Sequence, residues 1–141
     1  MKIKLAAVVT GMFLVLTAAP AYAHHPFAAE FDWKKPVTLT GKVTKFEFTN
    51  PHSFLYLDGK DENGAQVNWR LEMGNPKALA SAGWNKNTVK SGDEITVDAW
   101  LSKASRGSGS VKAVRLSSGR ELAGGSFILD TEKTKTKTAA N

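Results

Sequence analysis

The chain has 141 residues, a formal net charge of +6 and no cysteine. Its length fits one domain, and the lack of thiols excludes a disulfide framework, a thiolate metal site and a lipidated cysteine. Much of the positive charge lies in the leader and in the Lys133–Lys137 stretch. Because such runs are usually solvated ends, the charge is weak evidence for nucleic acid, and we expect no nucleic-acid partner.

The first 23 residues have the three parts of a secretory signal peptide. Lys2 and Lys4 form a basic start, residues 5–18 are mainly apolar, and Ala21-Tyr22-Ala23 is a small-x-small cleavage site. The apolar stretch is too short to cross a bilayer comfortably. We therefore expect cleavage after Ala23 and a soluble periplasmic protein with no membrane anchor.

The mature chain is expected to begin with an extended arm and then a long bent strand. Residues 24–36 include two prolines and no clean periodicity, which indicates an arm. From Val37 to Val43 apolar residues alternate, and then the apolar positions change parity to Phe46 and Phe48. A parity change within one strand indicates a β-bulge or a sharp bend.

Two more strands and a short helix follow. The continuously apolar segment 54–57 predicts a strand that is buried on both faces or packed under the arm, and residues 61–64 predict a hairpin turn. Residues 67–73 alternate as a strand with one solvated face. Asn75 suits a helix N-cap, Pro76 the first helical position and Gly83 the C′ position.

The last part of the domain is predicted to be β again. Residues 95–101 and 111–116 are the fourth and fifth strands, separated by a flexible Gly/Ser-rich segment at 102–110. A short apolar segment at 127–129 ends the domain, and residues 130–141 form a disordered Lys/Thr tail.

The order β-β-β-α-β-β predicts an all-β domain with one short helix, as in a five-stranded OB-fold-like barrel, over residues 37–129. The alternative is a generic antiparallel sheet or split β-sandwich with one helix.

Several segments resemble a family of small exported bacterial proteins classed as a domain of unknown function. They are His24-His25-Pro26-Phe27, Glu30-Phe31-Asp32, residues 37–43, Thr49-Asn50-Pro51-His52, residues 69–72, Gly83-Trp84 and Gly92-Asp93. The family usually has Ser where this chain has Pro26. The resemblance implies export and a compact β-barrel-like domain, and it implies no activity.

The three histidines form the candidate metal site. Cleavage after Ala23 would expose His24 with both an α-amine and an imidazole, and His25 or His52 could add a third nitrogen. Nitrogen-rich sets of this kind suit Cu(II), so copper is the candidate metal. Zinc fits less well because structural zinc sites need four protein ligands. In the competing interpretation, the His24-His25 pair binds metal adventitiously and His52 is structural.

Four carboxylates could complete such a shell, although their spacing selects none of them: Glu30, Asp32, Glu47 and Glu72. A second candidate site consists of Trp84, after the helix, and Trp100, at a polar-parity position of its strand, which could stack a ligand. The competing interpretation is that both tryptophans cover the core.

No catalytic motif is recognisable, so an enzyme is not expected. The sequence favours a non-enzymatic periplasmic binding protein with a candidate Cu(II) site at its mature N-terminus. The alternative is an OB-like module that binds a periplasmic glycan, peptide or protein partner and whose histidines are structural.

Overall fold

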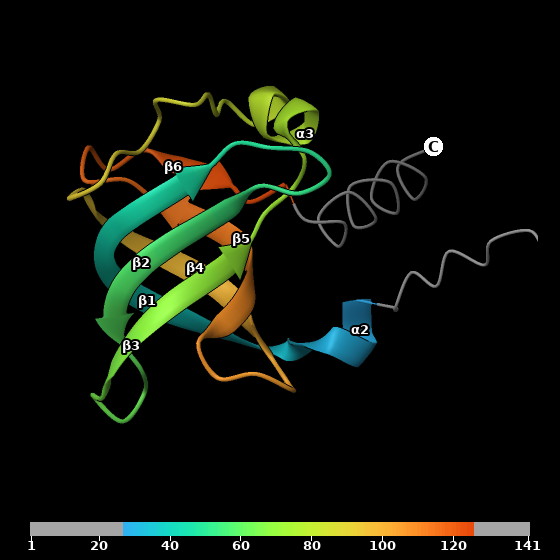
Figure 1. Cartoon of the computed structure of the whole chain (residues 1–141), viewed down its shortest axis with the longest axis vertical. Coiled ribbons are helices and arrows are strands. Elements are labelled where there is room, and N and C mark those ends of the chain that lie inside the picture. Colours follow the sequence, from blue (N-terminus) through green and yellow to red (C-terminus); the bar gives the residue numbers. More distant parts are fainter. Residues whose placement is uncertain (1–26, 126–141) are drawn as a thin grey trace, which may run out of the picture.

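The computed structural model describes residues 27–125, which form a small β-barrel with two short helices (Figure 1). The elements in chain order are α2 (Phe27–Glu30), β1 (Phe31–Glu47), β2 (Phe54–Lys60), β3 (Gln66–Glu72), α3 (Pro76–Ser81), β4 (Glu94–Ser102), β5 (Ser108–Arg115) and β6 (Glu121–Ala123). Neither of these helices is long and apolar enough to span a membrane. The predicted signal peptide, His24, His25, the 127–129 segment and the Lys/Thr tail all lie outside the described residues.

The strands close into a ring. The sheet order is β3-β2-β1-β4-β5-β6, and a parallel pairing between β3 and β5 joins the two sides. That pairing matches Arg70 with Ser108 and Glu72 with Ser110. The strand order and the helix between β3 and β4 confirm the OB-fold-like prediction, because an open sheet or a sandwich would lack the β3–β5 closure.

The long strand β1 belongs to both halves of the barrel. Its N-terminal part pairs with β4 and its C-terminal part with β2, and Gly41 is matched to Ile95 on one side and to Gly59 on the other. A Cβ atom on Gly41 would lie 2.3 Å from the Asp58 carbonyl oxygen, so only glycine allows this close approach. The predicted bulge is confirmed, since the β1–β2 register shifts between Val43 and Lys45.

Helix α3 begins and ends as its residues predict. The Asn75 side chain accepts a hydrogen bond from the Ala78 N–H at 2.9 Å, Pro76 is the first helical residue, and Gly83 has φ +94°. Leu79 on α3 is fully buried in the barrel core. The helix therefore covers one end of the barrel (Figure 1).

The strand β1 begins six residues earlier than the alternation indicates. Residues 31–36, predicted to belong to the arm, are part of β1, and Phe31 is 4% exposed and matched to Ser102. The β1–β4 register is irregular between Phe31 and Pro36. This irregularity breaks the period-two pattern and explains why the sequence does not show the strand there.

Other boundaries also differ from the prediction. Strand β2 is not buried on both faces: Leu55 and Leu57 point inward, whereas Phe54 and Tyr56 lie half-buried on the outer face. Of the predicted flexible segment, residues 108–110 are paired in β5 and help to close the barrel. Strand β6 was not predicted, because three residues are too few to show a pattern.

Replacing Gly41 with Ala should destabilise the fold by about 2–3 kcal/mol, because the new Cβ atom must displace the backbone of β2. Chemical denaturation of the two proteins measures the difference.

The matched control is Gly64→Ala, where no atom lies within 4 Å of the added Cβ and the only penalty is φ +78°. We expect that penalty to be about 1 kcal/mol. Equal losses in the two variants would contradict the assignment of Gly41 as the steric constraint.

Candidate functional site

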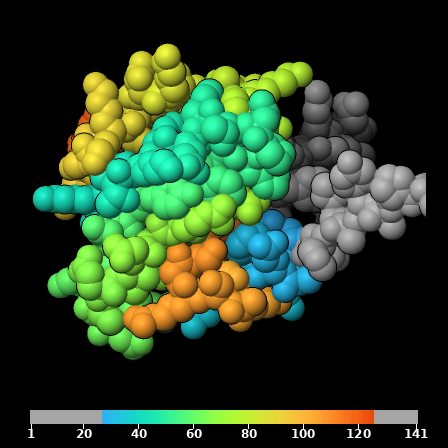
Figure 2. All heavy atoms as spheres, viewed as in Figure 1, coloured from blue at the N-terminus to red at the C-terminus, as the bar shows by residue number. Residues whose placement is uncertain are grey.

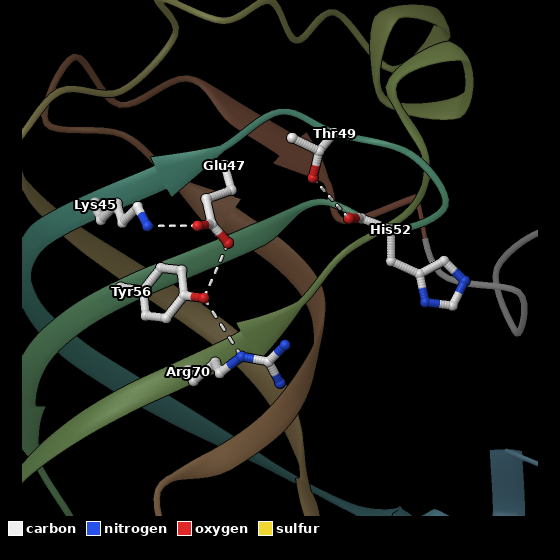
Figure 3. A network of polar contacts seen from close by, with 6 residues as sticks. All are labelled: Lys45, Glu47, Thr49, His52, Tyr56 and Arg70. Carbon is white, nitrogen blue, oxygen red and sulfur yellow. Dashed lines mark hydrogen bonds and ion pairs between the residues drawn. The ribbon is translucent and has the colours of Figure 1, made fainter.

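His52 lies in the loop at 48–53, which hydrogen bonds tie to the barrel. Buried Ser53 exchanges backbone hydrogen bonds with the two residues that follow β3, donating to the Gly74 carbonyl at 3.1 Å and accepting from the Met73 N–H at 2.8 Å. The Thr49 hydroxyl donates to the His52 carbonyl at 3.2 Å. The backbone at His52 is thus fixed while its side chain is 53% exposed and projects from the loop (Figure 3).

The imidazole of His52 is held by a carboxylate. Its Nδ1 atom lies 2.5 Å from the Oε1 atom of Glu72, which is the last residue of β3. Burial raises the pKa of Glu72, and the neighbouring His52 and Arg70 partly offset that increase. Glu30 at the end of α2 also raises the pKa of Glu72 through charge repulsion, so α2 lies near this end of β3.

Two kinds of contact fix α2 on the barrel. The ring of Phe27 packs edge-on against Trp100 at 5.5 Å between centroids. Lys103 donates from its Nζ to the Ala28 carbonyl at 2.7 Å and from its backbone N–H to the Glu30 carbonyl at 3.0 Å. Figure 2 shows α2, in blue, seated beside the orange β4–β5 segment. The first described residues are therefore anchored rather than extended into solvent.

The structure brings His52 together with one predicted carboxylate, Glu72, whereas Glu47 lies in a separate hydrogen-bonded network. His24 and His25 lie outside the described residues, so their distance from His52 stays a prediction. Among residues 27–125 no group of three or more acidic or histidine side chains is arranged to hold a metal ion.

Both tryptophans proposed as stacking platforms are buried. Trp84 is 3% exposed and its Nε1–H donates to the Ala123 carbonyl at 2.8 Å. Trp100 is 4% exposed, beneath Phe27. A ligand cannot stack on a ring without a free face, so we do not retain Trp84 and Trp100 as ligand-binding residues. Trp100 faces outward from its strand as its parity indicates, but α2 covers it.

The outer face of β1, β2 and β3 carries a polar network that the sequence did not reveal (Figure 3). Tyr56 is matched to Lys45 on one side and to Arg70 on the other. Its hydroxyl donates to Glu47 Oε2 at 2.9 Å and accepts from Arg70 Nε at 3.4 Å. Lys45 forms an ion pair with Glu47. These contacts, led by the Lys45 hydrogen bond and then that of Tyr56, lower the pKa of Glu47.

Cations cover the aromatic rings of this face. The guanidinium of Arg70 lies 3.7 Å from the ring centroid of Phe54, and the Lys45 ammonium lies 5.5 Å from that of Tyr56. Such pairs stabilise a solvent-facing sheet and also present charged donors and π-faces together. One sequence signal could have revealed this face. The alternation between inward and outward positions continues through Asp58, Gly59 and Lys60, and it places Phe54 and Tyr56 on the outer face.

These elements define an OB-fold-like barrel domain, with a partly exposed His52–Glu72 pair at the end of β3. Residues 11–111 match a family of unknown function, DUF6152, and the chain belongs to that family. This confirms the predicted resemblance. No curated protein and no solved structure matches the chain.

We expect neutral His52 to carry its proton on Nδ1, because Glu72 accepts there, and to leave Nε2 unprotonated. Nitrogen-15 NMR of the imidazole measures this tautomer directly. In Glu72→Ala the acceptor is lost and both tautomers should be populated. A proton on Nε2 in the unmodified protein would contradict the His52–Glu72 pairing.

Proposed function

We propose that this protein is exported to the periplasm, is cleaved after Ala23 and binds Cu(II), without enzymatic activity, at a site shared by its new N-terminus and His52. The ligands would be the amine and imidazole of His24 and the Nε2 of His52, with His25 as the alternative third ligand. The small-x-small pattern Ala21-Tyr22-Ala23 supports the cleavage position.

The His52–Glu72 pair is the observation that carries this proposal. A metal-binding histidine usually donates its second ring N–H to a carboxylate, which fixes the ring and makes the free nitrogen a better ligand. Glu72 is placed to accept from Nδ1, and the imidazole is half exposed. The Nε2 atom of His52 is therefore the part of the ring available to a metal.

The anchoring of α2 supports a contribution from the N-terminus. Phe27 packs on Trp100, and Glu30 is close enough to Glu72 to raise its pKa. His24 is three residues before Phe27, so covalent geometry allows a separation of up to about 11 Å between their Cα atoms.

The ligand types favour copper over zinc. Three nitrogen donors with a neighbouring carboxylate suit the tetragonal geometry of Cu(II). The α-amine titrates at about 7.7–8.0, so a metal displaces its proton at little cost near neutral pH.

The outer face of β1–β3 favours a second candidate, a module that binds a periplasmic glycan, peptide or protein while the histidines are structural. OB-folds bind oligosaccharides and oligonucleotides on the face of strands 2 and 3. In this chain that face carries Phe54, Tyr56 and Arg70, with two carboxylates beside them.

Calorimetric titration of the processed protein with Cu(II) tests the proposal. We expect one-to-one binding that His52→Ala weakens at least tenfold and that Glu72→Gln weakens by about 10–100-fold, because Glu72 orients His52. Lys45→Ala is the matched control: its partners on the outer face are Glu47 and Tyr56, so it should leave copper affinity unchanged.

A form with one extra residue before His24 should also lose tight binding, because its α-amine is displaced. Affinity equal to that of a free His-His-Pro peptide, or unaffected by His52→Ala, would contradict the shared site. Either of these copper-affinity results, together with weaker glycan binding by Arg70→Ala, would favour the second candidate.

A further inference from the structure

Arg70 is the one arginine whose terminal nitrogens have no acceptor among residues 27–125, a range that contains every arginine of the chain. The others each use a terminal nitrogen: Arg106 pairs with Asp61, Arg115 pairs with Glu121 and Arg120 donates to the Gly83 carbonyl. Within the same range the Arg70 side chain donates only from Nε, to the Tyr56 hydroxyl at 3.4 Å. Its two Nη atoms carry the remaining N–H donors on an exposed residue, so they are accessible to a ligand.

The guanidinium of Arg70 is held in place before any ligand arrives. It lies over the ring of Phe54, at 3.7 Å from the ring centroid, which orients its plane. The Tyr56 hydroxyl, itself bonded to Glu47 at 2.9 Å, holds the Nε edge. Figure 3 shows the two terminal nitrogens on the side of the guanidinium away from Tyr56. A fork held in this way loses little side-chain freedom when it binds, which lowers the cost of binding.

Two carboxylates limit the charge of a ligand that this guanidinium can accept. Glu47 on β1 and Glu72 on β3 are matched to the residue whose ring lies under Arg70. Neither forms an ion pair with Arg70; Glu47 pairs with Lys45 and Glu72 with His52 instead. The Lys45 hydrogen bond leads the effects that lower the pKa of Glu47, so that carboxylate is ionised at neutral pH. Because like charges repel, a phosphate dianion meets more repulsion here than a ligand with one negative charge.

We propose that the Nη edge of Arg70 is a binding site for a singly charged carboxylate group, carried by an acidic sugar or by the free C-terminus of a peptide. The two carboxylate oxygens would accept from the two Nη atoms, in the paired geometry that a planar guanidinium offers to a planar carboxylate. The inference rests on the second candidate function, since it names the chemical group that the outer face of β1–β3 would recognise. It does not depend on copper.

Proton–nitrogen NMR of the arginine Nε–H signals tests the inference on the processed, metal-free protein. The probes are glucuronate and the dipeptide N-acetyl-alanyl-alanine, and their neutral controls are glucose and the same dipeptide as its C-terminal amide. We expect at least one carboxylate probe to shift the Arg70 signal saturably, and its neutral control to leave the signal unchanged. A response to glucuronate alone identifies an acidic sugar as the source, and a response to the dipeptide alone identifies a peptide end.

Two variants separate the fork geometry from the charge. Arg70→Lys keeps the charge but loses the paired donors, so it should weaken binding about tenfold, as expected for one charged hydrogen bond. Backbone amide signals of β2 and β3 follow binding in this variant, and the loss of its Nε–H signal assigns that of Arg70. Arg115→Lys is the matched control, because the same change at an arginine paired with Glu121 should leave the affinity unchanged.

Three outcomes would overturn the inference: no saturable shift with either carboxylate probe, unchanged affinity in Arg70→Lys, or tighter binding of inorganic phosphate than of the carboxylates. The second candidate function fails separately. If the neutral controls shift the backbone signals of β2 and β3 while the Arg70 Nε–H signal stays unchanged, a ligand still binds the outer face and only the carboxylate site is wrong.

Discussion

Strand β1 has to pair with strands from both halves of the barrel, and this requirement shapes the whole fold. β1 pairs with β4 along its first part and with β2 along its last part, and both pairings meet at Gly41. There the backbone of β2 approaches so closely that a side chain would collide with the Asp58 carbonyl. The bulge between Val43 and Lys45 completes the bend. Without this bend in β1, strand β3 could not reach β5 and the ring of strands would not close.

The same closure gives the barrel two chemically different ends. At one end α3 and Trp84 complete the core, and the indole N–H is hydrogen-bonded. At the other end Trp69 lies beside a cavity with its N–H unpaired among the described residues. The His52 loop follows β1, so the position of the His52–Glu72 pair depends on how β1 leaves the bend.

The sequence predicted the elements whose signals are local. Asn75 and Gly83 marked α3, and the parity change after Val43 marked the bulge, because caps and alternation depend only on neighbouring residues. The sequence could not predict the start of β1 at Phe31, where an irregular register hides the pattern. It left the burial of Trp100 as one of two interpretations, because that burial depends on Phe27 packing over the ring. The pairing of His52 with Glu72 joins residues 20 positions apart and was equally hidden.

The central claim is that a folded barrel supplies His52 as a ligand to a metal held by the mature N-terminus. Electron paramagnetic resonance of the Cu(II)-loaded, processed protein, with nitrogen-15 in its histidines, counts the coordinating imidazoles directly. The proposed site predicts that His52→Ala loses one imidazole nitrogen from the copper spectrum while the signal of the α-amine stays. An identical nitrogen count in His52→Ala would contradict it, because the metal would then be held by the N-terminal residues alone.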